Sequence, residues 1–199
     1  MDPDERSIDA ARERGLSGFA GTIEQFETDQ RFDLVLMLNL IEHVADPEAV
    51  LAKAAGRLAP GGLVWLQTPN FRALDGRIFR HRNWAGYHCP RHWALFSEAG
   101  LRRVLSRAGL EPVVFKRGQG GSFWAQSLLG QRRARLMKRG RLPPPGSSGI
   151  EGENQLPKPL VRYRAFAPLA ALGAGFDVAT RRFREVSQVV VMARRRGGE

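Results

Sequence analysis

The chain of 199 residues is long enough for one domain with a substantial apolar core. Its one cysteine, Cys89, excludes an internal disulfide framework and favours a reducing compartment. The charged amino terminus resembles neither a signal peptide nor a transit peptide, and the apolar stretch at residues 165–176 is shorter than the roughly 20 residues that cross a bilayer. We therefore expect a cytoplasmic protein.

The net charge of +11 is concentrated in the later part of the sequence. Residues 1–60 carry 12 acidic and 6 basic side chains, whereas residues 61–199 carry 8 acidic and 25 basic ones. A basic half is compatible with nucleic acid, anionic lipid or phosphorylated ligands. Surface arginines that are simply solvated also explain it, and we favour that interpretation. Nucleic acid is the least favoured partner, because the basic residues are not interleaved with a recognisable reading motif.

The amino-terminal segment predicts a helix followed by a weak strand. Asp2 or Asp4 can cap a helix over residues 2–14. Residues 16–20 then predict a short strand that ends in a polar turn.

The clearest strand in the sequence is Phe32–Leu38. Its continuous apolar run is typical of a strand that is buried on both faces. The run then breaks into a polar cluster, at the position where the carboxyl end of a parallel strand opens onto a ligand crevice. The members of this cluster are Asn39, Glu42 and His43.

Helices and strands continue to alternate after this cluster. Asp46 can cap a helix, which the Pro-Gly-Gly turn at residues 60–62 ends, and residues 63–68 predict the next strand. A long loop over residues 70–95 leads to another helix and to a strand at residues 110–115. This order predicts an open, mostly parallel α/β sheet.

Residues 118–185 predict a helical insertion or lid. Helices are expected at residues 123–139 and 161–183, with Pro168 kinking or splitting the second one. A flexible linker rich in proline, glycine and serine separates them near residues 141–159. We therefore divide the chain into an α/β core at residues 1–117, this insertion, and a segment at residues 186–199 that holds the last strand and a basic tail.

Three segments of the sequence carry a family likeness. They are LNLIEHVADPEAVL, RLAPGGLVWLQTPN and PRHWALFSEAGLRRVLSRAGLEPV. In order and spacing they resemble the carboxyl portion of class I S-adenosylmethionine-dependent methyltransferases. Such proteins commonly show an apolar-Glu-His-Val loop, a Pro-Gly-Gly turn, and a Pro-Arg-His segment before a helix capped by serine.

The resemblance implies a Rossmann-like sheet with the strand order 3-2-1-4-5-7-6, mostly parallel with an antiparallel last strand. On that pattern residues 16–20 match strand three and residues 32–38 match strand four. The sequence offers no strand one and no glycine-rich G-x-G-x-G turn. We therefore expect a sheet that lacks its first strands, with an exposed hydrophobic edge. Either the true start lies upstream, which we favour, or the chain is a remnant, and as it stands it should bind the cofactor weakly or not at all.

The resemblance also implies which residues hold the cofactor, S-adenosylmethionine. Asp2 matches the acidic residue that accepts hydrogen bonds from the ribose hydroxyls, and Thr22 and Ile23 match the adenine contacts. Asn39 ends strand four, where a side chain faces the amino-acid part of the cofactor or the substrate. The residues alone leave simpler interpretations open, with Asp2 as a helix cap and Thr22-Ile23 as an ordinary turn.

Catalysis is assigned to the pair Glu42-His43. The cofactor supplies the reactivity of a methyl transfer, so the enzyme must align the acceptor and remove its proton. Histidine suits that task, because its ordinary pKa is near 6.5. We favour His43 as base or substrate-orienting group. In the structural alternative His43 packs under the following helix and Glu42 makes a surface ion pair.

The loop at residues 83–93 predicts a wall for the substrate. Tyr87 offers apolar area with a polar tip, and Arg91 can hold a phosphate or carboxylate. His92 fixes the loop or faces the acceptor. A metal is not predicted, because His88, Cys89 and His92 lack a second, separated pair of ligands. Some relatives that methylate quinol precursors bind a metal through an acid and the Glu-His pair, but Asn39 stands where that acid would be.

The sequence therefore predicts methyl transfer from S-adenosylmethionine to a small-molecule or lipid-linked acceptor, compromised by the missing strands. Two interpretations of the basic insertion stay open: contact with an anionic membrane surface, at the inner membrane face, or a lid whose arginines are solvated. The alternative function is a non-catalytic remnant, or a protein that binds a membrane or a partner peripherally.

Overall fold

The computed structural model describes residues 1–88, 90–118, 120–141, 160–183 and 185–197, with the backbone alone for residues 160–165. Cys89 and almost all of the predicted linker near residues 141–159 lie outside the described residues.

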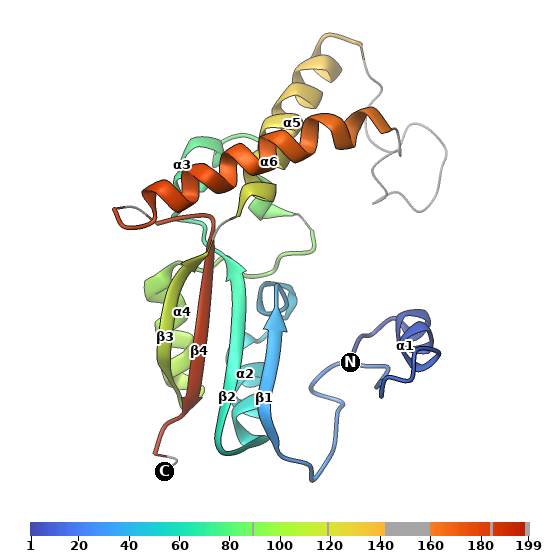
Figure 1. Cartoon of the computed structure of the whole chain (residues 1–199), viewed down its shortest axis with the longest axis vertical. Coiled ribbons are helices and arrows are strands. Elements are labelled where there is room, and N and C mark those ends of the chain that lie inside the picture. The colour runs from blue at the N-terminus through green and yellow to red at the C-terminus, as the bar shows by residue number, and fades with distance from the viewer. Residues whose placement is uncertain (89, 119, 142–159, 184, 198–199) are drawn as a thin grey trace.

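A four-stranded sheet forms the centre of the molecule, in the order β1-β2-β4-β3 (Figure 1). The strands β1 and β2 are parallel, and β4 is antiparallel to both β2 and β3. This confirms the predicted mixed sheet with an antiparallel last strand, and it reproduces the 4-5-7-6 part of the methyltransferase order. The strands are β1 Phe32–Leu38, β2 Leu58–Pro69, β3 Leu110–Gly118 and β4 Gln188–Arg195.

The strand predicted at residues 16–20 is absent. Only an isolated parallel bridge joins Asp2 to Ala20, through hydrogen bonds from the Asp2 amide to the Phe19 carbonyl and from the Gly21 amide to the Asp2 carbonyl. The prediction was wrong because this segment has no sheet neighbour among the described residues. Helix α1 (Glu5–Arg12), capped by Asp4, lies beyond the β1 edge of the sheet in Figure 1.

Two helices cover one face of the sheet, α2 (Pro47–Gly56) and α4 (Glu98–Arg107), which lie behind the strands in Figure 1. Both begin at the predicted caps: Asp46 accepts from two amides of α2 at 3.0 Å, and Ser97 accepts from the Gly100 amide at 3.1 Å. Their apolar stripes meet the strands in one core, which includes Val50, Leu51, Leu101, Leu105, Val64, Leu66, Val189 and Val191.

The expected burial of β1 on both faces is wrong for one face. Met37, which points toward the helices, is 1% exposed, whereas Leu34, Leu36 and Leu38 are 47–56% exposed. These leucines share the opposite face because side chains alternate along a strand. No helix in the described part of the chain packs on that face.

The Pro-Gly-Gly segment lies inside β2 and not at the end of a helix. Helix α2 ends at Gly56, and β2 already begins at Leu58, which pairs with Phe32. The register then slips between Phe32 and Leu34, so the extra residues form an irregularity in the strand. Gly62 is required there, since a Cβ atom would lie 2.7 Å from the Phe32 carbonyl oxygen.

The predicted loop over residues 70–95 contains two short helical elements, α3 (Leu74–Phe79) and η2 (Ala85–Tyr87). Buried Asp75 accepts a hydrogen bond from the Trp84 indole at 2.8 Å, which ties these elements together. A polar partner for a buried indole is not visible in a local sequence pattern, so the elements were missed.

The predicted insertion forms the helices α5 (Gly121–Lys138) and α6 (Leu160–Thr180), which lie above the carboxyl ends of β1 and β2 (Figure 1). Helix α6 runs without a break through Pro168, so the predicted split does not occur. The two helices pack closely: a Cβ atom on Gly173 would lie 2.6 Å from the Trp124 Cβ. None of the described helices is both long and apolar enough to cross a membrane.

Asp177 is the polar anchor between these two helices. It is buried and accepts from the Gly120 amide at 2.9 Å and from the Trp124 indole at 3.0 Å. Asp177→Ala leaves both donors without this partner, so we expect the free energy of unfolding to fall by about 1–3 kcal/mol. Urea denaturation measures it, with Asp29→Ala at an exposed position as the matched control. Equal stability of the two variants would contradict the anchoring role.

Candidate active site

The predicted polar cluster lies at the carboxyl end of β1, where the chain turns sharply. Asn39 adopts a left-handed conformation with φ of +51°, which asparagine tolerates better than most residues. Its amide still donates to the Gln67 carbonyl of β2 at 2.8 Å. The chain then enters the short helix η1 (Ile41–His43), which carries Glu42 and His43.

Glu42 is held by three hydrogen bonds to two other segments. Its carboxylate accepts from the Thr68 hydroxyl of β2 at 2.9 Å, and its main-chain carbonyl accepts from the amides of Trp93 and Ala94 at 2.7 and 3.2 Å. The side chain is only 1% exposed, and its Oε1 atom has no hydrogen-bond partner among the described residues. Burial raises the pKa of Glu42, an effect that the Thr68 hydrogen bond only partly offsets. Glu42 is thus not a surface ion pair.

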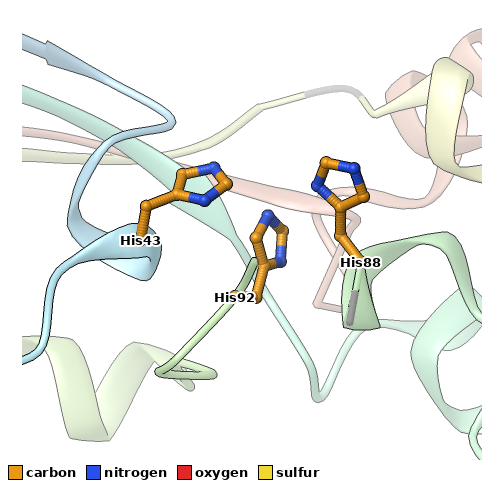
Figure 2. A group of neighbouring side chains, drawn as sticks. All are labelled: His43, His88 and His92. Atoms are coloured by element: carbon orange, nitrogen blue, oxygen red, sulfur yellow. The ribbon is translucent and has the colours of Figure 1, made fainter. Parts of the chain in front are cut away.

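These contacts place His43 beside two histidines that are distant in sequence, His88 and His92 (Figure 2). The ring centroid of His43 lies 4.6 Å from that of His92 and 6.1 Å from that of His88. The rings of His88 and His92 are 5.1 Å apart. We call these three side chains the histidine cluster.

Main-chain carbonyls orient two rings of the histidine cluster. His43 Nδ1 lies 3.1 Å from the Arg91 carbonyl oxygen, and His92 Nδ1 lies 2.7 Å from that of Gly86. A carbonyl oxygen only accepts, so each Nδ1 must carry the hydrogen. In the neutral ring the free lone pair is then on Nε2, which can accept a proton or bind a metal.

The surroundings of His88 and His92 favour the neutral form of both imidazoles. Burial lowers the pKa of His92 and, to a greater degree than the nearby charges, the pKa of His88. Arg91 and His43 lower the pKa of His88 further. Like-charge repulsion and lost hydration act in the same direction here.

An open cavity of about 1100 Å³ runs along the edge of β1 and contains His43 in its lining. The predicted adenine contacts Thr22 and Ile23 line the same cavity. The structure thus brings the predicted base, His43, to the same cavity as the two predicted adenine contacts, which lie 20 and 21 positions before it in the sequence. Apolar residues of β1, including Leu34, Leu36 and Met37, form its wall.

The other two predicted cofactor residues are placed differently. Asp2 stands between two residues that line the cavity, Met1 and Pro3, and its Oδ1 accepts from the Asp4 amide at 2.8 Å. Asn39 is exposed and is not among the lining residues. Its side-chain oxygen accepts from the side-chain nitrogen Nε2 of Gln188, on β4, at 3.4 Å.

The predicted substrate residues separate into two groups. His92 belongs to the histidine cluster, and Arg91 supplies the carbonyl that orients His43 while its own side chain is exposed. Tyr87 lies elsewhere: it donates to the Arg80 carbonyl at 2.7 Å and lines a second cavity of about 800 Å³. That cavity is also lined by Arg72, Arg77, Arg80, Trp84 and Glu185.

Comparison with known proteins identifies the family. Residues 1–114 match the model of a family described as a methyltransferase domain. The chain belongs to this family, the class I S-adenosylmethionine-dependent methyltransferases, and its cofactor is S-adenosylmethionine.

Two relatives of known name are similar to part of this chain. A ubiquinone biosynthesis O-methyltransferase of Bradyrhizobium sp. (strain ORS 278) is 33% identical over 93 residues, which cover 44% of this chain and 32% of that protein. One of Bordetella avium (strain 197N) is 32% identical over 127 residues, which cover 56% of this chain and 52% of that protein. The chain thus spans between a third and about half of the length of these relatives.

A solved structure supports the fold. Mycolic acid cyclopropane synthase, complexed with S-adenosylhomocysteine, superposes with a TM-score of 0.51 and 14% identity. The alignment covers 96% of this chain and 67% of that protein. At this identity the likeness concerns the fold alone.

The buried Glu42 carboxyl predicts an unusual dependence of stability on pH. Because burial raises its pKa above the ordinary 4.5, the native state keeps this proton while the unfolded chain loses it. The free energy of unfolding should therefore fall as the pH rises above about 4.5 and stay lower beyond the native pKa. Glu42→Gln removes this contribution, so the variant should gain stability relative to the parent chain as the pH rises. Urea titrations between pH 4 and 8 measure the difference, and a constant difference would contradict it.

Proposed function

We propose that the protein transfers a methyl group from S-adenosylmethionine to an oxygen of a small-molecule or lipid-linked acceptor. The observation that carries this proposal is the position of His43, which lines the same cavity as Thr22 and Ile23 in a chain of the methyltransferase family. The choice of oxygen is supported by the ubiquinone biosynthesis O-methyltransferases among the relatives.

Different residues are assigned to different parts of the cofactor. Thr22 and Ile23 contact the adenine end, and Asp2 accepts from the ribose through Oδ2, since its Oδ1 already binds the Asp4 amide. Asn39, which follows the last residue of β1 and does not line this cavity, is assigned to the methionine part from the family resemblance alone. When bound, the cofactor supplies the electrophilic methyl group, and the chain supplies position and a base.

His43 takes the proton of the acceptor. His43 Nε2 would accept the proton of the acceptor hydroxyl, because in the neutral ring Nδ1 donates its hydrogen to the Arg91 carbonyl and Nε2 carries the free lone pair. Glu42 does not touch the acceptor: buried on Thr68, it is a positioning residue that fixes the direction of His43. The exposed Arg91 side chain holds an acidic group of the acceptor.

Replacing His43 tests the catalytic assignment. General-base catalysis contributes about 100-fold or more to a rate, so we expect His43→Ala to lower kcat by at least that factor with little change in cofactor affinity. Transfer of a labelled methyl group to phenolic acceptors, followed at saturating cofactor concentration, measures it. His81→Ala is the matched control, since His81 lies outside the histidine cluster.

Two results would contradict this proposal. Equal rates for His43→Ala and His81→Ala would remove His43 from the reaction. Absence of methyl transfer at any cofactor concentration would favour the alternative, a non-catalytic binding protein.

We further propose that the protein is cytoplasmic and contacts an anionic membrane through α6, where a lipid-linked acceptor would be available. The supporting observation is the apolar outer side of this helix and of the turn after it: Leu172 is 72% and Phe183 84% exposed. Arg181 and Arg182, both exposed, stand next to Phe183. Apolar side chains beside arginines are the combination that binds anionic lipid surfaces.

Membrane contact predicts a specific loss on substitution. Burial of a large apolar side chain contributes about 1.5–3 kcal/mol, so the double variant Leu172→Glu/Phe183→Glu should bind anionic vesicles at least tenfold more weakly. Sedimentation with phosphatidylglycerol vesicles measures this, with phosphatidylcholine vesicles for comparison. Leu16→Glu serves as the control, because Leu16 is also exposed, at 61%, but lies near the amino terminus and not in α6. Unchanged sedimentation of the double variant would contradict the proposed contact.

A further inference from the structure

The histidine cluster brings together three of the chain's four histidines from two separate segments. His43 comes from η1 at the end of β1, whereas His88 and His92 come from the loop after η2. One ring nitrogen from each lies within 4.8 Å of one from each of the others, and Figure 2 shows the three rings turned toward a common space. Three imidazoles so close together are a known arrangement for a metal ion.

The distances require only a small adjustment to bind a metal. Zinc–nitrogen bonds of about 2.0–2.1 Å at tetrahedral angles place the nitrogens about 3.3 Å apart. The present upper limit of 4.8 Å exceeds this by roughly 1.5 Å, which rotation of the imidazole side chains can supply. The His88 side chain has no hydrogen-bond partner among the described residues, and its ring lies edge-on to the other two imidazoles of the cluster, so side-chain hydrogen bonds do not oppose its rotation.

The second observation is the support behind the rings. A histidine that binds a metal usually donates its other ring N–H to a carbonyl or carboxylate, which fixes the tautomer and direction of the ring. His43 and His92 already have this arrangement, through the carbonyls of Arg91 and Gly86. Both rings therefore present Nε2 as the available ligand atom.

We propose that His43, His88 and His92 bind one first-row transition-metal cation of the zinc class. Imidazole nitrogen favours zinc, copper, nickel or iron, whereas magnesium and calcium prefer oxygen ligands. Three protein ligands leave a fourth position for an oxygen from water or from a ligand. Because His43 lines the cavity along β1, that position borders the candidate active site.

The proposed metal site differs from one built on a carboxylate and the Glu-His pair. The Glu42 carboxylate is directed to Thr68 and is buried, and Asn39 carries no charge. A metal was not predicted from the sequence, because His88 and His92 have no second pair of ligands nearby in the chain. The fold supplies the third ligand, His43.

Metal binding does not depend on the proposed methyl transfer, and the two uses of His43 belong to different states. With the metal on Nε2, His43 accepts no proton, and an acceptor hydroxyl bound at the fourth position is oriented by the metal. Without the metal, His43 is available as the base.

Zinc titration of the full chain tests the proposal without any methyl acceptor. The parent should carry Cys89→Ser, because this lone thiol adjoins His88 in sequence and thiolates bind zinc. Isothermal calorimetry should give one zinc per chain, and cobalt in its place should show the visible absorption of a tetrahedral site. Magnesium at the same concentration should not compete.

Single substitutions then locate the ligands. His43→Gln, His88→Gln and His92→Gln should each weaken zinc binding at least tenfold, whereas His81→Gln should leave it unchanged. His88→Gln is the most informative variant, because the substitution keeps the main-chain bonds of this residue and its side chain makes no hydrogen bond to a described residue. Circular dichroism checks that each variant folds. No stoichiometric binding by the parent, unchanged affinity in His88→Gln, or an equal loss in His81→Gln would each overturn the proposal. Failure of methyl transfer would leave this titration unaffected, so the two proposals are tested separately.

Discussion

The candidate site depends on one buried carboxyl group, that of Glu42. Its side chain binds Thr68 on β2, and its main-chain oxygen binds the amides of Trp93 and Ala94. One residue therefore joins the end of β1 to its neighbouring strand and to the loop that follows η2. A carboxyl that is 1% exposed is costly to keep charged, so this junction is retained at the expense of stability. It places His43 next to His92, although 49 positions separate them in the sequence.

The loop of the histidine cluster is held from the other side by the insertion. The Ala85 amide donates to the Ser127 hydroxyl of α5 at 2.9 Å, and the Asn83 side chain donates to the Gly130 carbonyl at 3.1 Å. Helix α5 is in turn fixed to α6 through Asp177. The histidine cluster thus lies between the sheet and the insertion, and a displacement of either would change its geometry. In this fold the insertion is therefore part of the support of the site.

Local patterns in the sequence predicted most of the sheet and its capped helices, because periodicity and caps act over a few residues. The Glu-His corner after β1 was found in the same way, from polar residues at the end of an apolar run. The histidine cluster was not, because it depends on a contact between His43 and a loop 45 positions further on. The wrong prediction of a strand at residues 16–20 also reflects a distant contact. Its residues suit a strand, but a strand needs a neighbouring strand to pair with, and local sequence does not show whether one is there.

Strand β1 is more apolar than its surroundings in the fold require. Leu34, Leu36 and Leu38 are as apolar as the residues that face α2, yet about half of their surface is exposed. In the register, Leu36 lies opposite Trp65 of β2, which extends the same apolar surface. Two of these leucines also line the cavity along β1. A ligand that fills this cavity would remove apolar surface from water as it binds, so ligand affinity and folding stability are linked at this face.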